Sequence, residues 1–248
     1  MEKNLQIRKF GLIGKNISYS FSRHYFTNKF QDLKLKNHQY VNFDLQAIDN
    51  FLKINLEEVS GFNVTIPYKE KIFQFLTEVD NVAKEIGAVN TIKITNNNQL
   101  IGYNTDYYGF RESLNPLLKP HHTKALVLGT GGASKAILYV LKELNITYLV
   151  VSRSPKDGQI SYKDISEKVI NDYTLIINST PLGTYPDIDK CPNIPYNYLS
   201  DKHLLFDVIY NPEKSTFLKK GEQKGATIIN GLKMLELQAE KAWEIWNK

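Results

Sequence analysis

Cysteine is nearly absent from this sequence: Cys191 is the single cysteine in 248 residues. One cysteine cannot form an internal disulfide, and without nearby partner ligands it offers no metal-site spacing. We therefore expect neither a disulfide scaffold nor a bound metal.

Long hydrophobic runs are missing as well. No stretch approaches the roughly 18 apolar residues that cross a bilayer, and the opening MEKNLQIRKFGLIG lacks the apolar core of a signal peptide. We expect a cytoplasmic protein without membrane attachment.

Clustered positive charge is the third absence. Lysine and arginine number 31 against 26 acidic residues, giving a net charge of +5 spread along the chain. No basic run is interleaved with aromatics, so nucleic acid is not an expected partner, and a small anionic ligand fits better. Coiled-coil heptads are also lacking, which leaves monomer and homodimer both open.

Short apolar stretches alternate with helical patterns along the chain. The first half has strand-like segments at 10–13, 40–45 and 61–66, a helix with Tyr25, Phe26, Phe30 and Leu33 on one face, and a helix opened by Pro67. The second half repeats the rhythm with ALVLG, YLVVS, LIINST and LLFDV. Such alternation predicts an α/β fold of parallel sheets covered on both faces.

Asn115 and Pro116 interrupt a helical pattern between the two halves. We predict two lobes with a cleft between them: an N-terminal α/β domain over residues 1–103 and a Rossmann-like, doubly wound parallel sheet over 104–231. The amphipathic stretch 232–248 is expected to form a helix that packs back on the first domain.

A glycine-rich turn stands between a strand and a helix in ALVLGTGGASKAI. Gly129 permits a tight turn, and Gly131 lets a backbone approach a pyrophosphate at the positive end of the next helix. Ser134 occupies the place of the usual third glycine. The context favours a dinucleotide site over a plain glycine turn.

The next strand ends in Ser152, Arg153 and Ser154 rather than in the carboxylate that NAD sites place there. An arginine fork and hydroxyls can bind a 2′-phosphate, so NADP is favoured over NAD. A simple surface arginine is the alternative.

Polar residues follow the strands of the first half. Lys69 falls in the first turn after Pro67, where a helix dipole would disfavour a cation and lower its pKa, which suits a proton donor. Asp106 could pair with it across a cleft or cap a helix near Tyr107. Without further information, Lys69 is equally a surface lysine.

Seven motifs, taken in order, resemble shikimate dehydrogenase along nearly the whole chain: NVTIPYK, GAVNT, GYNTD, GTGGASKA, INSTPLG, FDVIYNP and INGLKMLELQA. The resemblance implies NADPH-dependent reduction of 3-dehydroshikimate to shikimate, a step of aromatic amino-acid biosynthesis, without metal. Residues 1–103 would then be the substrate-binding domain and 104–231 the NADP-binding domain.

By the same resemblance, Lys69 and Asp106 form the catalytic pair. Substrate contacts would come from Ser20, Ser22, Thr65, Asn90, Tyr210 and Gln238. Cofactor contacts would come from Gly129, Gly131, Gly132, Ala133, Ser152, Arg153, Thr180 and Gly231.

The loop ISYSFSR departs from the family, which usually has histidine and proline where Tyr19 and Arg23 stand here. This difference leaves a broad quinate/shikimate dehydrogenase as an alternative. A catalytically silent, NADP-binding regulatory relative is the alternative outside enzymes, and the presence of both Lys69 and Asp106 argues against it.

Overall fold

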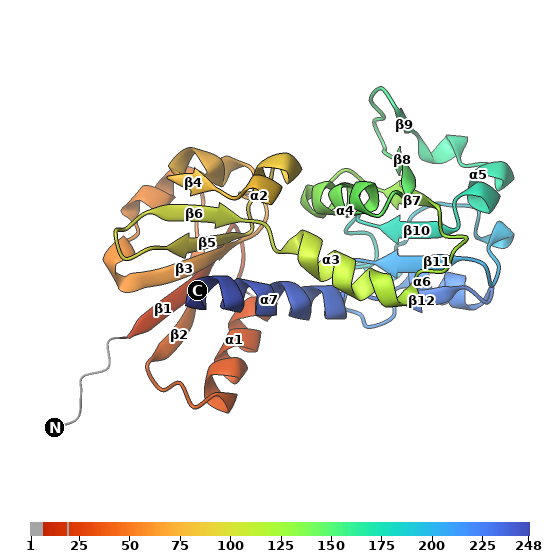
Figure 1. Cartoon of the computed structure of the whole chain (residues 1–248). Helices are drawn as coiled ribbons and strands as arrows, with labels where there is room; N and C mark the ends of the chain where they lie inside the picture. Colours follow the sequence, from red (N-terminus) through yellow and green to blue (C-terminus); the bar gives the residue numbers. More distant parts are fainter. Residues whose placement is uncertain (1–6, 19) are drawn as a thin grey trace. The chain divides into compact units, whose positions relative to one another are not determined.

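The computed structural model describes residues 7–18 and 20–248, and it divides into two compact units (Figure 1). One unit comprises Met1–Thr105 with Ala239–Lys248, and the other comprises Asp106–Gln238. The chain passes from one unit to the other two residues after the boundary predicted at residue 103, and it returns seven residues after the predicted start of the last segment at 232.

The first unit contains a six-stranded sheet in the order β2-β1-β3-β5-β6-β4. Its strands are β1 (Arg8–Gly14), β2 (His38–Asp44), β3 (Val59–Val64), β4 (Glu78–Val79), β5 (Thr91–Ile94) and β6 (Leu100–Tyr103). β5 pairs antiparallel with both β3 and β6, whereas the pairs β1–β2, β1–β3 and β4–β6 are parallel. The prediction of a wholly parallel sheet is therefore wrong for this unit, because a short hairpin joins β5 to β6.

Helices of the first unit are short, apart from α1 (Phe21–Asp32) and the last turns of the long C-terminal helix. The others are α2 (Asn81–Ile86) and the 3₁₀ turns η1 (Ile48–Lys53), η2 (Leu56–Glu58) and η3 (Lys71–Phe75). Phe26 and Phe30 of α1 are buried as predicted, but Leu33 is 50% exposed because it lies at the C-cap.

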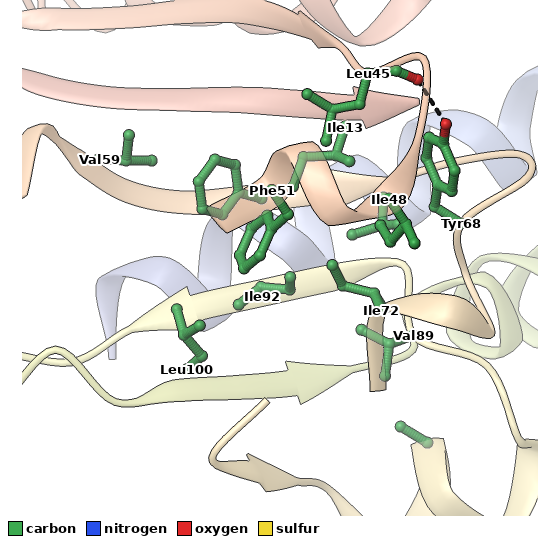
Figure 2. Packing of buried hydrophobic residues seen from close by; sticks show 13 residues of the cluster. Ile13, Leu45, Ile48, Phe51, Val59, Tyr68, Ile72, Val89, Ile92 and Leu100 are labelled. Atoms are coloured by element: carbon green, nitrogen blue, oxygen red, sulfur yellow. Dashed lines mark hydrogen bonds between the residues drawn. The ribbon is translucent and has the colours of Figure 1, made fainter. Parts of the chain in front are cut away.

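Alternate residues of β1 point to opposite faces of this sheet and belong to two different cores. Ile13 joins η1, β3 and η3 in one core, in which Tyr68 donates to the Leu45 carbonyl at 2.6 Å (Figure 2). Phe10 and Leu12 join α1, β2 and the C-terminal helix α7 (Leu232–Asn247) in the other.

Trp246 anchors α7 within the first unit. Its side chain is 4% exposed, stacks on Phe10 with ring centroids 4.7 Å apart, and donates from Nε1 to the Ile92 carbonyl at 3.0 Å. A Cβ on Gly61 would lie 2.5 Å from that indole nitrogen, so glycine is needed there for the tryptophan to fit. The last turns of the chain are thereby bound to the middle of the sheet.

Trp246→Ala is expected to lower the free energy of unfolding by about 3–5 kcal/mol, because it removes a buried aromatic side chain and its hydrogen bond. Trp243→Ala, at a half-buried position on the same helix, is the matched control and should cost less. Urea unfolding of both variants measures the difference, and equal losses would contradict the anchoring role.

The second unit contains a six-stranded sheet in the order β12-β11-β10-β7-β8-β9, and every pairing in it is parallel. The strands are β7 (Lys124–Leu128), β8 (Thr147–Val151), β9 (Gln159–Ile160), β10 (Leu175–Asn178), β11 (Leu204–Asp207) and β12 (Thr227–Ile229). This arrangement confirms the predicted Rossmann-like sheet.

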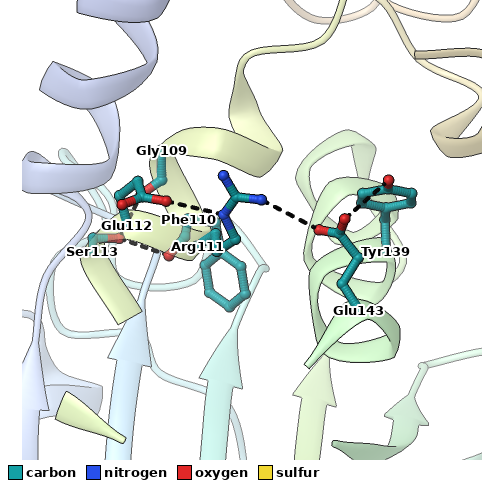
Figure 3. Close-up of polar contacts among 7 residues, drawn as sticks. All are labelled: Gly109, Phe110, Arg111, Glu112, Ser113, Tyr139 and Glu143. Carbon is teal, nitrogen blue, oxygen red and sulfur yellow. Dashed lines mark hydrogen bonds and ion pairs between the residues drawn. The ribbon is translucent and has the colours of Figure 1, made fainter. Parts of the chain in front are cut away.

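Helices cover both faces of that sheet. α3 (Asp106–Leu114) and α4 (Gly132–Glu143) pack on one face, and α5 (Glu167–Asp172) and α6 (Thr216–Glu222) on the other. Shorter 3₁₀ turns are η4 (Asn115–Leu117), η5 (Tyr162–Asp164) and η6 (Tyr196–Tyr198). Arg111 of α3 lies 3.8 Å from the Glu143 carboxylate of α4 (Figure 3).

Membrane-spanning helices and metal-binding clusters are both absent from the described residues. None of their helices is long and apolar enough to cross a membrane. No group of three or more His, Cys, Asp or Glu side chains among them is arranged to hold a metal ion.

Candidate active site

In the parallel sheet of the second unit, the order in which the chain adds strands reverses between β7 and β10. From these neighbours the chain continues outward, to β8 on one side and to β11 on the other. In open α/β sheets, ligands bind beyond the carboxyl ends of the strands at such a point. Gly129 follows β7 and Thr180 follows β10, so this edge holds the residues predicted for the cofactor.

The glycines of the turn serve different physical needs. Gly129 has φ +101°, and a Cβ there would lie 2.8 Å from Thr180 Cγ2. Gly131 is the N-cap of α4, and a Cβ on it would have Ser179 O, at 3.8 Å, as its nearest neighbour. Backbone conformation and packing thus require Gly129, whereas the open space beside Gly131 leaves room for a ligand at the positive end of the helix.

Ser134 stands in place of the third glycine and is 3% exposed. Its hydroxyl donates to the Gly131 carbonyl at 2.6 Å, and its backbone N–H reaches the same oxygen at 3.0 Å. The serine therefore holds the turn closed from within the helix. Gly132 is the first residue of α4, and Ala133, the next, is half-buried.

Thr180 is held by a chain of buried polar side chains. Its backbone N–H and hydroxyl donate to Asn178 Oδ1 at 3.0 and 2.7 Å. Asn178 Nδ2 in turn donates to Asp207 Oδ1 at 3.0 Å. Asn178 and Asp207 are both fully buried. Sequence reasoning did not single out these two residues, although each lies in a quoted motif at the end of a strand.

Asp207 is a buried carboxyl group with three hydrogen-bond donors. Burial raises its pKa to about 6, against the lowering effect of bonds from Ser215, the Ile209 N–H and Asn178. The Ser215 hydroxyl donates to Oδ2, and the Ile209 N–H to Oδ1 at 3.1 Å.

The raised pKa of Asp207 predicts a pH-dependent stability. A carboxyl whose pKa is higher in the folded state contributes stability that is present below its unfolded value near 4 and is lost as the pH rises through 6. The free energy of unfolding of the wild type, less that of Asp207→Asn, is the quantity to follow. This difference should fall by up to about 3 kcal/mol from pH 4 to pH 7. Urea titrations at several pH values measure this difference, and a flat or rising one would contradict the assignment.

The loop after β8 carries the residues predicted to select NADP. Ser152 Oγ accepts the Ser154 N–H at 3.2 Å, which bends the chain directly after the strand. Arg153 is exposed, and within the described part of the chain its side chain has no hydrogen bond or ion pair. Burial raises the pKa of the nearby Tyr162 phenol, against the lowering effect of the Arg153 guanidinium. The arginine is thus available to an anionic ligand.

Two other predicted contacts of this unit, Tyr210 and Gly231, follow β11 and β12. Tyr210 is half-buried. Gly231 donates its N–H to the Ile209 carbonyl at 3.0 Å, and a Cβ on it would lie 2.1 Å from the Val208 oxygen. Packing against the chain itself therefore requires this glycine, whatever it contributes to a cofactor.

In the first unit, antiparallel pairing brings polar residues to one edge. Asn63 near the end of β3 pairs with Thr91 at the start of β5, and Thr91 pairs with Tyr103 at the end of β6. Thr65 follows β3, and its N–H donates to the Ile13 carbonyl at 2.8 Å. The predicted substrate residues Thr65 and Asn90 thus lie at the same edge.

Asn90 ties the start of β5 to the end of β6. Its Oδ1 accepts the Thr105 backbone N–H at 2.6 Å, and its Nδ2 donates to the Thr105 hydroxyl at 3.0 Å. Both residues are buried, as is Asn104, which donates to the Ala88 carbonyl at 2.9 Å. These bonds fix the segment that leads into Asp106.

Lys69 lies in a turn, and its side chain is half-buried. Its carbonyl accepts the Val89 N–H at 2.8 Å, which fixes the turn beside the GAVNT segment. The helix expected directly after Pro67 is not formed. The next helical element is the 3₁₀ turn η3, which begins only at Lys71. The helix-dipole argument for Lys69 is therefore wrong, although the residue still follows a strand end.

The two serines of the first loop have different surroundings. Ser20 is the N-cap of α1, and its hydroxyl accepts the Arg23 N–H at 3.2 Å. Ser22 is the second residue of α1 and is 9% exposed. Tyr19, one of the two departures from the family pattern, lies outside the described residues.

Asp106 and Gln238 are the predicted site residues at the ends of the second unit. Asp106 is the first residue of α3 and is 7% exposed, so it is not the cap of a helix that begins later. The positive end of a helix favours a carboxylate at this position. Gln238, also 7% exposed, donates to the Leu235 carbonyl at 2.9 Å. Lys69 belongs to the other unit, and its pairing with Asp106 stays a prediction.

Known proteins similar to this chain share one description. A family model for the shikimate dehydrogenase substrate binding domain matches residues 12–92. A relative from Clostridium botulinum, named shikimate dehydrogenase (NADP(+)), is 38% identical over 95% of each chain.

Solved structures agree with that description. The crystal structure of shikimate dehydrogenase from Aquifex aeolicus has a TM-score of 0.87 and 32% identity, covering 99% of this chain and 94% of its own. Shikimate 5-dehydrogenase from Thermus thermophilus, in complex with NADP(H) and shikimate, has a TM-score of 0.85 and 29% identity, covering 97% and 93%.

Proposed function

Because this chain belongs to the shikimate dehydrogenase family, we propose that it catalyses the reversible, NADPH-dependent reduction of 3-dehydroshikimate to shikimate. The observation that carries the proposal is 38% identity to an NADP-dependent shikimate dehydrogenase over 95% of both chains. The reaction belongs to aromatic amino-acid biosynthesis, and we expect it to take place in the cytoplasm. We expect the protein to be a monomer or a homodimer.

The residues of the second unit fit NADP. Gly131, Gly132 and Ala133 offer backbone N–H groups at the start of α4, which suit a pyrophosphate. Gly129, whose own N–H donates to the Val151 carbonyl at 2.9 Å, makes the turn that leads to them. Ser152 and exposed Arg153 suit a 2′-phosphate, and Thr180 and Gly231 the nicotinamide end. The bound dinucleotide supplies the hydride, and these residues bind and orient it.

For the substrate, we propose that hydroxyl groups bind the carboxylate and that amides bind the ring hydroxyls. Ser20, Ser22 and Tyr210 are assigned to the carboxylate. Thr65, Asn90 and Gln238 are assigned to the ring hydroxyls. The burial of Asn90 and Gln238 supports this, because a buried amide holds one orientation and can discriminate hydroxyl positions.

For the chemical step, we propose that Lys69 donates a proton to the oxygen that becomes the new hydroxyl. Asp106, as a carboxylate, would orient the Lys69 ammonium and a ring hydroxyl of the substrate. Placing a charged donor where negative charge develops stabilises the transition state more than the ground state.

Lys69→Ala should lower kcat for shikimate oxidation at least about 100-fold, the range expected for loss of a general acid–base group. Its KM for NADP should stay within about twofold. Lys71→Ala, an exposed lysine two residues away, is the matched control and should keep wild-type kcat. NADPH absorbance in steady state measures both, and normal turnover of purified Lys69→Ala would reject the role.

Gly131→Ala and Gly129→Ala should separate binding from folding. The methyl group of Gly131→Ala meets only an ordinary contact, with the Ser179 carbonyl oxygen at 3.8 Å, so the melting temperature should change little while the KM for NADP rises at least about tenfold. Gly129→Ala should instead lose several kcal/mol of stability, because it combines a positive φ with a 2.8 Å contact. Thermal melts and NADP titrations test this contrast, and an unchanged NADP affinity in Gly131→Ala would contradict the site.

Two alternatives differ from this proposal in what they predict. A broad quinate/shikimate dehydrogenase would oxidise quinate at a comparable rate. A silent regulatory relative would bind NADPH without turnover.

A further inference from the structure

Tyr40 has its polar end deep inside the first unit. The residue lies on β2, is 6% exposed, and its ring stacks on Phe26 with centroids 4.8 Å apart. Its hydroxyl donates to Asn63 Oδ1 at 2.7 Å. A phenylalanine would fill the same aromatic core, so packing accounts for the ring but not for the hydroxyl.

Beyond Asn63, the hydrogen bonds continue toward Asn90. Asn63 Nδ2 donates to Thr91 Oγ1 at 3.2 Å, and Thr91 Oγ1 donates to Asn90 Oδ1 at 3.1 Å. Asn63 and Thr91 are 5% and 0% exposed. Tyr40 of β2 is thus connected by hydrogen bonds to the polar residues at the end of β3 and the start of β5.

The donors and acceptors in this row of hydrogen bonds all run in one direction, from Tyr40 to Asn90, and that direction depends on the Tyr40 proton. Burial raises the pKa of Tyr40, against the lowering effect of Ser22, so the phenol stays protonated at neutral pH. A phenol that donates to Asn63 Oδ1 fixes that amide with its Nδ2 toward Thr91, which then donates onward. Without this proton, the Asn63 amide loses the bond that distinguishes its oxygen from its nitrogen.

We propose that Tyr40 is a positioning residue for substrate binding, which orients Asn90 through Asn63 and Thr91 without touching the substrate. The inference rests on the function proposed above, which assigns Asn90 to the substrate. A buried network of this kind holds its members in one arrangement only while every member is satisfied.

Tyr40→Phe removes the hydroxyl and keeps the ring. We expect the KM for shikimate to rise about tenfold, the equivalent of one lost hydrogen bond, with kcat and the KM for NADP within about twofold. Tyr196→Phe is the matched control, since the hydroxyl of half-buried Tyr196 donates to the Pro192 carbonyl at 2.8 Å in the other unit. It should lower the melting temperature and leave both KM values unchanged.

Thr91→Val breaks the same row of hydrogen bonds one step further along, at a fully buried side chain. It should reproduce the rise in the KM for shikimate.

A KM for shikimate within twofold of wild type in soluble Tyr40→Phe would overturn the inference, even if the melting temperature fell. If that variant does not fold, an unchanged KM in Thr91→Val would overturn it equally. A wild-type protein that neither oxidises nor binds shikimate would overturn the proposed function itself, and this inference with it.

Discussion

Hydrogen bonding between strands is the constraint on which both candidate sites depend. In the second unit, parallel β7 and β10 end side by side, which brings the glycine turn next to Ser179 and Thr180. In the first unit, antiparallel β5 begins where β3 ends, which brings Asn90 to the edge that carries Thr65. Strand register alone thus brings together side chains that are distant in sequence. The residues at the strand ends then decide which ligands each site can bind.

Buried polar chains then hold the strand ends in place. Asp207 and Asn178 fix Thr180 in one unit, and Asn90 fixes Thr105 in the other. Burying such groups costs free energy unless each donor and acceptor is paired. The expense is consistent with a site that must present particular donors at particular points, because a loop held only by apolar contacts would allow more orientations.

Much of this arrangement was predictable from sequence. The alternation of strand and helix patterns gave the α/β class and the parallel second sheet, and the glycine turn gave the start of α4. Local pattern failed where pairing partners decide the outcome. The β5–β6 hairpin made the first sheet mixed, and Lys69 lies in a turn although Pro67 suggested a helix. Asn63, Tyr40 and Asp207 were missed because their roles arise from hydrogen bonds across strands, which no local spacing encodes.

The most direct test of the account is the rate of NADPH formation, followed by absorbance, when the purified protein meets shikimate or quinate with NADP or NAD in four parallel reactions. The account predicts rapid reduction with shikimate and NADP, and slow or no reduction in the other three. Silence in all four reactions, with tight NADPH binding intact, would contradict it and favour a protein that binds the dinucleotide without turning it over.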